Sequence, residues 1–183
     1  LETAYPIAQQ LNQLNVERRQ VEAEMKQQAI SALQHVQLQA DSLPAALVMF
    51  DEQWHQGVIG IVAGRLKEQF HRPSLVFAPD EDGIHIKGSA RSIEGVHIRD
   101  TIEQVAEQYP HLVSHFGGHA AAAGLTLKKD NFDEFKRVFI QSIAEMDENL
   151  FQATLWTDGE LTDASLHLET LDWIDRLGPW GQK

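Results

Sequence analysis

The sequence predicts a layered α/β domain, with a central mixed sheet flanked by helices and a long connecting helix in front of it. Three observations support this prediction. Residues from about 7 to 39 contain neither Gly nor Pro. Between residues 41 and 148, short apolar runs of strand character alternate with segments of helical period. The composition, with 43% hydrophobic and 23% charged residues, is ordinary for a globular protein.

A stripe of residues spaced three or four apart predicts one helix from Ile7 to Gln39, about 50 Å long at 1.5 Å per residue. The stripe consists of Ile7, Leu11, Leu14, Arg18, Val21, Met25, Gln28 and Ala32. Its two polar members leave it too thin to support a free helix, so we expect the helix to lie against other domains as a strut. A coiled-coil dimer is the alternative.

The next elements follow from local signals. Pro44 ends the first helix, because proline disfavours helix in the preceding residue. Alternation or apolar character predicts strands at 45–50, 74–78, 84–92 and 123–127. Helical spacing predicts helices at 57–70 and 100–108, and an acidic turn occupies 79–83. Asn131 and Glu134 resemble a capping box that opens a last helix, with Phe132, Phe135, Val138, Phe139 and Ile143 on one face.

These elements predict three parts: a connecting helix at 1–40, a domain at 41–148, and a tail at 149–183. A strand and turn at 153–159 and a short helix within 161–177 are expected in the tail. They are too few for a core of their own, so we expect the tail to begin a further domain. The start at Leu1 and the end in a Gly/Pro-rich turn suggest a piece of a longer chain.

Composition also narrows the functional classes. The absence of cysteine excludes disulfides and thiolate metal sites and favours the cytoplasm, and no apolar run approaches the roughly 20 residues needed to span a membrane. The formal net charge of −12 argues against a general nucleic-acid binder, which would need a basic face. Any contact with DNA must therefore use a few local arginines and backbone amides.

Three segments have the character of anion sites. Residues 117–124 read GGHAAAAG, so only glycines and alanines surround His119 and a ligand could approach the backbone beside its imidazole. The alternative is a tight turn into an Ala-rich helix, with His119 as the cap. Residues 54–66, WHQGVIGIVAGRL, place Gly57 at a predicted helix start beside His55, where free backbone N–H groups could bind an anion. Gly57, Gly60 and Gly64 share one face of this helix, and close packing of Gly60 and Gly64 on the sheet is the alternative. Residues 87–92, KGSARS, place Ser89 and Arg91 on one face of a strand with Lys87 in line. A solvent-facing strand edge is the alternative there.

In this order, the three segments resemble the DHH-associated domain of the RecJ family, bacterial single-strand-specific DNA exonucleases of the DHH phosphoesterase superfamily. The likeness extends to residues 14–22, LNVERRQVE, and 177–182, LGPWGQ. It implies a metal-dependent 5′-to-3′ single-stranded DNA exonuclease of DNA repair and recombination. The Asp-His-His motif of that superfamily is missing. We therefore expect Mn²⁺ or Mg²⁺ to be bound by a catalytic domain outside this chain, no metal within it, and little activity of the chain alone.

The resemblance also assigns roles. Ser89 and Arg91, with Lys87, would grip the 5′ phosphate of single-stranded DNA, while His119 and His55 would face the metal site of the missing domain. Gly57, Gly117 and Gly118 would contact substrate through the backbone. The expected partners are single-stranded DNA and the other domains of the parent chain, with no membrane.

Two other functions compete with this interpretation. An RNA-binding module like the related domain of alanyl-tRNA synthetases is the main alternative. A zinc site on His111, His115 and His119 is disfavoured, because the two glycines make a continuous helix there unlikely.

Overall fold

The computed structural model describes residues 4–39, 43–154, 157, 159–160 and 162–178. The chain divides into two compact units, Leu1–Ala153 and Thr154–Lys183. No helix among the described residues is long and apolar enough to cross a membrane.

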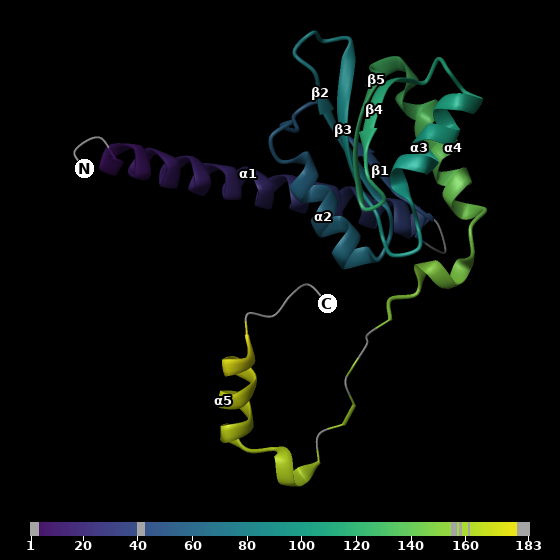
Figure 1. The fold of residues 1–183 in the computed structure, drawn as a ribbon. Coiled ribbons are helices and arrows are strands. Elements are labelled where there is room, and N and C mark those ends of the chain that lie inside the picture. Colours follow the sequence, from purple (N-terminus) through teal and green to yellow (C-terminus); the bar gives the residue numbers. More distant parts are fainter. Residues whose placement is uncertain (1–3, 40–42, 155–156, 158, 161, 179–183) are drawn as a thin grey trace. The chain divides into compact units, whose positions relative to one another are not determined.

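A five-stranded sheet in the order β1-β2-β3-β5-β4 forms the centre of the first unit (Figure 1). β1 pairs with β2 in parallel, and the other neighbours are antiparallel. The strands are β1 Leu47–Phe50, β2 Ser74–Pro79, β3 His85–Arg91, β4 Val113–Gly118 and β5 Ala122–Lys128. The mixed sheet with helices on both faces confirms the predicted fold class.

Helices α3 (Ile98–Gln108) and α4 (Phe132–Ala144) cover one face of the sheet. The core beneath them is rich in aromatic rings: Phe135 is stacked on Phe139 at 5.6 Å and meets Phe77 edge-on at 5.9 Å. Burial of such large rings supplies much of the hydrophobic stabilisation of a domain of this size. This face is the main core of the fold.

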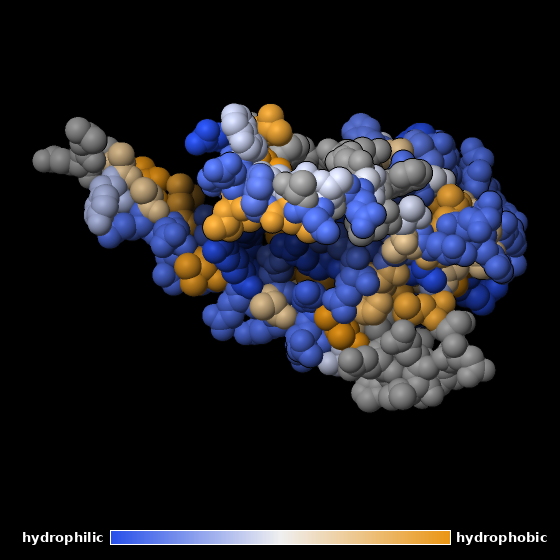
Figure 2. Space-filling view, turned by 90° about the horizontal axis from the view of Figure 1, so that it is seen from below, coloured by the Kyte–Doolittle hydropathy of each residue, from blue (hydrophilic) through white to orange (hydrophobic). Residues whose placement is uncertain are grey.

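Helices α1 (Ala4–Gln39) and α2 (Ile59–Phe70) form a smaller core on the opposite face. Met25 and Ala29 of α1 are buried, and Trp54 Nε1 donates a hydrogen bond to Gln28 Oε1 at 2.8 Å. Earlier along α1 the apolar stripe is exposed, from 57% at Ile7 to 53% at Leu14. Figure 2 shows hydrophobic and hydrophilic surface intermixed on the protruding part of the molecule. The predicted long helix is confirmed, and the expected contact of its exposed stripe with other domains stays a prediction.

Several predicted boundaries and one motif need correction. The helix expected at 57–70 begins at Ile59, and the one expected at 100–108 begins at Ile98. Strand β4 was not predicted. The capping box is wrong: the Asn131 side chain accepts no bond at the start of α4, and its Nδ2 donates to the carbonyl oxygen of His111 at 2.7 Å. A tertiary contact has taken the place of the local cap.

The second unit contains one regular α-helix among its described residues, α5 (Leu168–Leu177), which is the short helix expected in the tail. His167 caps it by accepting a bond from the Thr170 N–H at 3.3 Å. The strand expected at 153–159 is wrong for the described residues there, which are not in a strand. Residues 155, 156 and 158 lie outside the described part.

Candidate nucleic-acid interface

Strand β3 carries alternating residues on its two faces. Gly88 and Ala90 face the main core and are buried, while Lys87, Ser89 and Arg91 face α2. A pocket of about 390 Å³ lies between these three side chains and the start of α2. Its lining residues are Gln56, Gly57, Ile59, Gly60, Ile61, Lys87, Ser89 and Arg91. The strand and the helix start that were singled out separately in the sequence therefore meet at one site.

Gly60 of α2 leaves room for the side chains of Ser89 and Arg91 on β3. A Cβ atom at this position would lie 2.9 Å from Nη2 of Arg91 and 3.0 Å from Oγ of Ser89. Arg91 Nη1 donates to Ser89 Oγ at 3.0 Å and to the carbonyl oxygen of Ala90 at 2.9 Å. Within the described part of the chain, no carboxylate pairs with this guanidinium. Arg91 is thus held in place while its charge stays available to an anion.

Two lining residues of the pocket, Gln56 and Lys87, are linked through the side chain of Asp80, which does not itself line the pocket. Lys87 Nζ lies 2.9 Å from Asp80 Oδ1, and Gln56 Nε2 donates to the same oxygen at 3.2 Å. The hydrogen bond from Lys87 and one from the Glu81 N–H hold the pKa of Asp80 below its usual value. The Asp80 carboxylate raises the pKa of Lys87 in return. Lys87 is therefore charged but already engaged, unlike Arg91.

We expect Asp80→Asn to strengthen binding of inorganic phosphate at this pocket by about fivefold at low salt. The substitution releases Lys87, so that its positive charge can attract the bound anion together with that of Arg91. Phosphate titration followed by NMR would measure the change. Asp82→Asn is the matched control, because it removes the same charge from the partner of His85. Equal gains in both variants would mean that net charge, and not release of Lys87, is responsible.

His55 lies next to the pocket but does not line it. Its Nδ1 accepts the N–H of Gly57 at 3.0 Å, and its side chain is exposed. The expectation that Gly57 offers a free N–H at the helix start is therefore wrong in this structure, because that donor is used by His55. The start of α2 itself carries no side-chain cap, which leaves the positive end of the helix dipole uncompensated beside Ser89 and Arg91.

His119 follows β4 in the tight turn to β5 and is exposed. Gly118 has a φ of +148°, and a Cβ atom there would lie 2.4 Å from the Ala122 carbonyl oxygen. Gly118 thus has a structural role in the turn, besides any contact with substrate. The His119 N–H donates to the Ala122 carbonyl at 2.7 Å, and Ala122 pairs with Arg91. His119 and Arg91 therefore lie toward the same end of the sheet.

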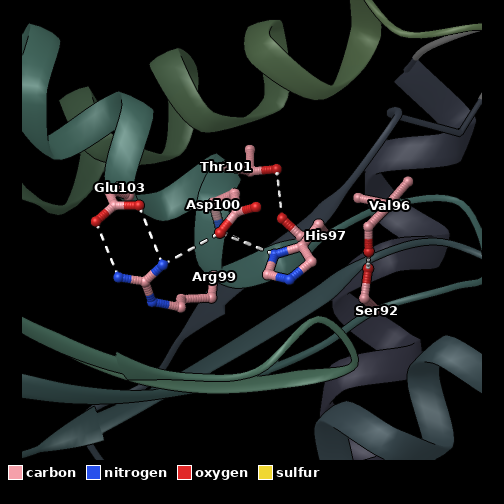
Figure 3. A network of polar contacts seen from close by, with 7 residues as sticks. All are labelled: Ser92, Val96, His97, Arg99, Asp100, Thr101 and Glu103. Atoms are coloured by element: carbon pink, nitrogen blue, oxygen red, sulfur yellow. Dashed lines mark hydrogen bonds and ion pairs between the residues drawn. The ribbon is translucent and has the colours of Figure 1, made fainter.

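The loop between β3 and α3 holds this turn in place. The N–H groups of Ser92 and Ile98 donate to the carbonyls of Ala121 and Ala120, at 2.9 and 3.0 Å. Figure 3 shows how the loop is itself fixed: buried Ser92 Oγ donates to the Val96 carbonyl at 2.7 Å, and His97 accepts from the N–H of Asp100. The turn that carries His119 is thus tied to the first turn of α3.

The pocket unites four of the eight residues selected from the sequence: Gly57, Lys87, Ser89 and Arg91. His55, Gly117, Gly118 and His119 lie outside its lining. Sequence reasoning did not select Gln56, although it belongs to the WHQG segment, and it interpreted Gly60 only as a site of close packing on the sheet and not as part of a pocket wall. Among the described residues, no three His, Cys, Asp or Glu side chains are grouped so that they could hold a metal ion. The site offers cations and hydrogen-bond donors for an anionic ligand.

Residues 43–145 match the DHHA1 domain. The chain belongs to this family. It is 45% identical over 180 residues to the single-stranded-DNA-specific exonuclease RecJ of Haemophilus influenzae, covering 98% of this chain and 31% of that protein. For the RecJ of Escherichia coli, identity is 42% over 177 residues, covering 96% and 30%. The chain thus spans about a third of the length of these relatives.

Solved RecJ structures share the fold of this DHHA1-containing chain. RecJ of Thermus thermophilus in complex with Mg²⁺ aligns with a TM-score of 0.62 at 30% identity, over 76% of this chain and 20% of that one. A RecJ exonuclease bound to manganese aligns with a TM-score of 0.63 at 29% identity, over 82% and 34%. The resemblance to the RecJ family inferred from three short motifs is therefore confirmed along nearly the whole chain.

Proposed function

We propose that this chain is the substrate-binding part of a RecJ-like 5′-to-3′ single-stranded DNA exonuclease that acts in DNA repair and recombination in the cytoplasm. The identity to RecJ proteins over 96–98% of the chain supports this assignment. The parent protein would comprise a catalytic domain holding Mg²⁺ or Mn²⁺, α1 as the connecting helix (1–40), the DHHA1 domain (41–148) and a further domain beginning in 149–183.

Within this function, Ser89 and Arg91 grip the 5′ phosphate of the strand. The observation that carries the proposal is the position of Arg91, oriented by Ser89 Oγ at 3.0 Å in an open pocket and without a carboxylate partner among the described residues. A terminal phosphate carries more charge than an internal diester and presents oxygens that match the guanidinium fork. Lys87 adds charge at the rim, and Gly57, Gly117 and Gly118 contribute the low surface around it.

His119 and His55 would face the metal site of the catalytic domain from the edge of this pocket. Both imidazoles are exposed, and among the described residues neither belongs to a group of three or more His, Cys, Asp or Glu side chains that could hold a metal ion. This exposure supports a role for both imidazoles in contacting substrate or a metal-bound ligand, while the metal ligands themselves would come from the other domain. When bound there, the ions would activate the attacking water and stabilise the leaving oxygen.

The test compares binding of the 183-residue chain to one labelled single strand with a 5′ phosphate and to the same strand with a 5′ hydroxyl. We expect the phosphorylated strand to bind about tenfold more tightly, since one charge-assisted contact contributes roughly 1.5–3 kcal/mol. Fluorescence anisotropy at fixed salt measures both affinities. Equal affinities would refute the end grip, and a clear preference for folded transfer RNA over both strands would favour the RNA-binding alternative.

A further inference from the structure

Two cations line the pocket from β3, and only one of them is free. Arg91 and Lys87 stand on the same face of the strand with Ser89 between them, so their Cα atoms are about 13 Å apart. Arg91 has no carboxylate partner among the described residues, whereas Lys87 Nζ lies 2.9 Å from Asp80 Oδ1. One end of the pocket therefore offers a cation, and the other end offers an ion pair.

Hydrogen bonds fix Asp80 at the Lys87 end. Besides Lys87, its Oδ1 accepts from Gln56 Nε2 at 3.2 Å and from the Glu81 N–H at 2.8 Å. Gln56 is tied to the same place, because its Nε2 also donates to the Pro79 carbonyl oxygen at 2.8 Å. The donors, Lys87 foremost, hold the pKa of Asp80 below its usual value, so the carboxylate is ionised at neutral pH. Any anion that reaches Lys87 meets this fixed negative charge.

The number of phosphates at a strand end decides how the end fits such a pocket. A single phosphate can be held by Arg91 and Ser89 without disturbing Lys87. A triphosphate adds two phosphoryl groups with further negative charge, and the space open to them is the stretch between Arg91 and Lys87. There they meet a cation that is already neutralised and a carboxylate of like charge. Placing a like charge against one ligand is a common way to discriminate it from another.

We propose that Asp80 restricts this pocket to strand ends that carry one 5′ phosphate, by neutralising the cation that a second phosphate would need. The proposal rests on the proposed function, because it concerns which ends Ser89 and Arg91 accept. Asp80 is a specificity-determining residue that acts without contacting the accepted end. Strands whose 5′ phosphate was left by phosphodiester hydrolysis enter the pocket. Strands that keep the 5′ triphosphate of an initiating nucleotide are excluded.

The test compares one labelled single strand carrying a 5′ monophosphate, a 5′ triphosphate or a 5′ hydroxyl. The 183-residue chain is titrated with each at fixed salt, without added metal, and fluorescence anisotropy gives the affinities. We expect the wild type to bind the monophosphate about tenfold more tightly than the triphosphate. In Asp80→Asn, the freed Lys87 can pair with the additional phosphates, so this ratio should fall to about one or below. The ratio is independent of any general gain in phosphate binding.

Asp82→Asn is the matched control from the same hairpin. It removes an equal charge, but the Asp82 carboxylate is held within its own turn by the N–H groups of Ile84 and His85 and by the His85 ring. This variant should keep the wild-type ratio. Asp80→Ala, which lacks both the charge and the amide, should reproduce the result of Asp80→Asn. Thermal unfolding of each variant checks that the fold is retained.

The outcomes separate this proposal from the function on which it rests. If the wild type binds triphosphate and monophosphate equally but prefers both to the hydroxyl, exclusion by Asp80 is refuted and the proposed function stands. An unchanged ratio in both Asp80 variants also refutes it, as does an equal fall of the ratio in Asp82→Asn, which would assign the effect to net charge. Equal binding of all three ends by the wild type would overturn the proposed function, and the exclusion with it.

Discussion

Arg91→Ala should weaken binding of a 5′-phosphorylated single strand by about tenfold to a hundredfold. The variant loses a charge-assisted contact of roughly 1.5–3 kcal/mol, while the same strand with a 5′ hydroxyl should bind almost as before. Arg91→Lys should recover only part of the loss, because an ammonium group does not reproduce the two-pronged guanidinium geometry. Anisotropy titrations with the two strands give the two affinities directly.

Folding should survive the substitution, since the side chain is only half-buried and its bonds go to Ser89 Oγ and the Ala90 carbonyl. Thermal unfolding of the variant checks this. Arg65→Ala is a suitable control, because it removes a cation of α2 that is paired with Glu22 and Glu68. An equal loss for both strand ends in Arg91→Ala would show that the residue contacts the strand generally, and end recognition would be discarded.

Gly60→Ala should lower the affinity for the 5′-phosphorylated strand by about tenfold. The new methyl group would lie within 3.0 Å of both Arg91 Nη2 and Ser89 Oγ, so both side chains must move away from their present positions. A guanidinium displaced in this way no longer matches the phosphate geometry. The same strand-end comparison measures the effect.

Gly64→Ala is the matched control in the same helix, because a Cβ atom there has no neighbour within 4 Å. Both variants should unfold at an equal or higher temperature, as alanine stabilises a helix by up to about 1 kcal/mol relative to glycine. Only Gly60→Ala should lose phosphate preference. Equal behaviour of the two variants would contradict the positioning role of Gly60.

Local periodicity was sufficient for most of the fold but not for β4. The run at 84–92 alternates regularly, so its strand and the shared face of Ser89 and Arg91 followed from the sequence. In β4, the pairing register shifts between Val113 and His115. This irregularity and the two glycines obscure the alternation of period two, so no strand signal remains. β4 is a strand because it pairs with β5, and this pairing between separate segments cannot be inferred from the local sequence.

For the site, as for the fold, the sequence predicted the separate segments but not the contacts between them. Residue chemistry indicated separate anion-binding segments, and the family resemblance joined them, but contact between Gly60 and Arg91 depends on how a helix packs across a strand. The capping box failed for a similar reason: Asn131 has a distant partner, His111, whose position the sequence does not indicate. Contacts between segments far apart in the chain were therefore the part that local rules did not reach.

The anchoring of the His119 turn bears on the thermodynamics of binding. Two backbone bonds, from Ser92 at 2.9 Å and from Ile98 at the start of α3 at 3.0 Å, and the buried Ser92–Val96 bond hold this turn before any ligand arrives. A surface that is already ordered loses little conformational entropy on association. Binding of a DNA strand beside the His119 turn should therefore cost little free energy for ordering the turn. The amides of Ser92 and Ile98 should then show the same slow hydrogen exchange with and without a bound strand.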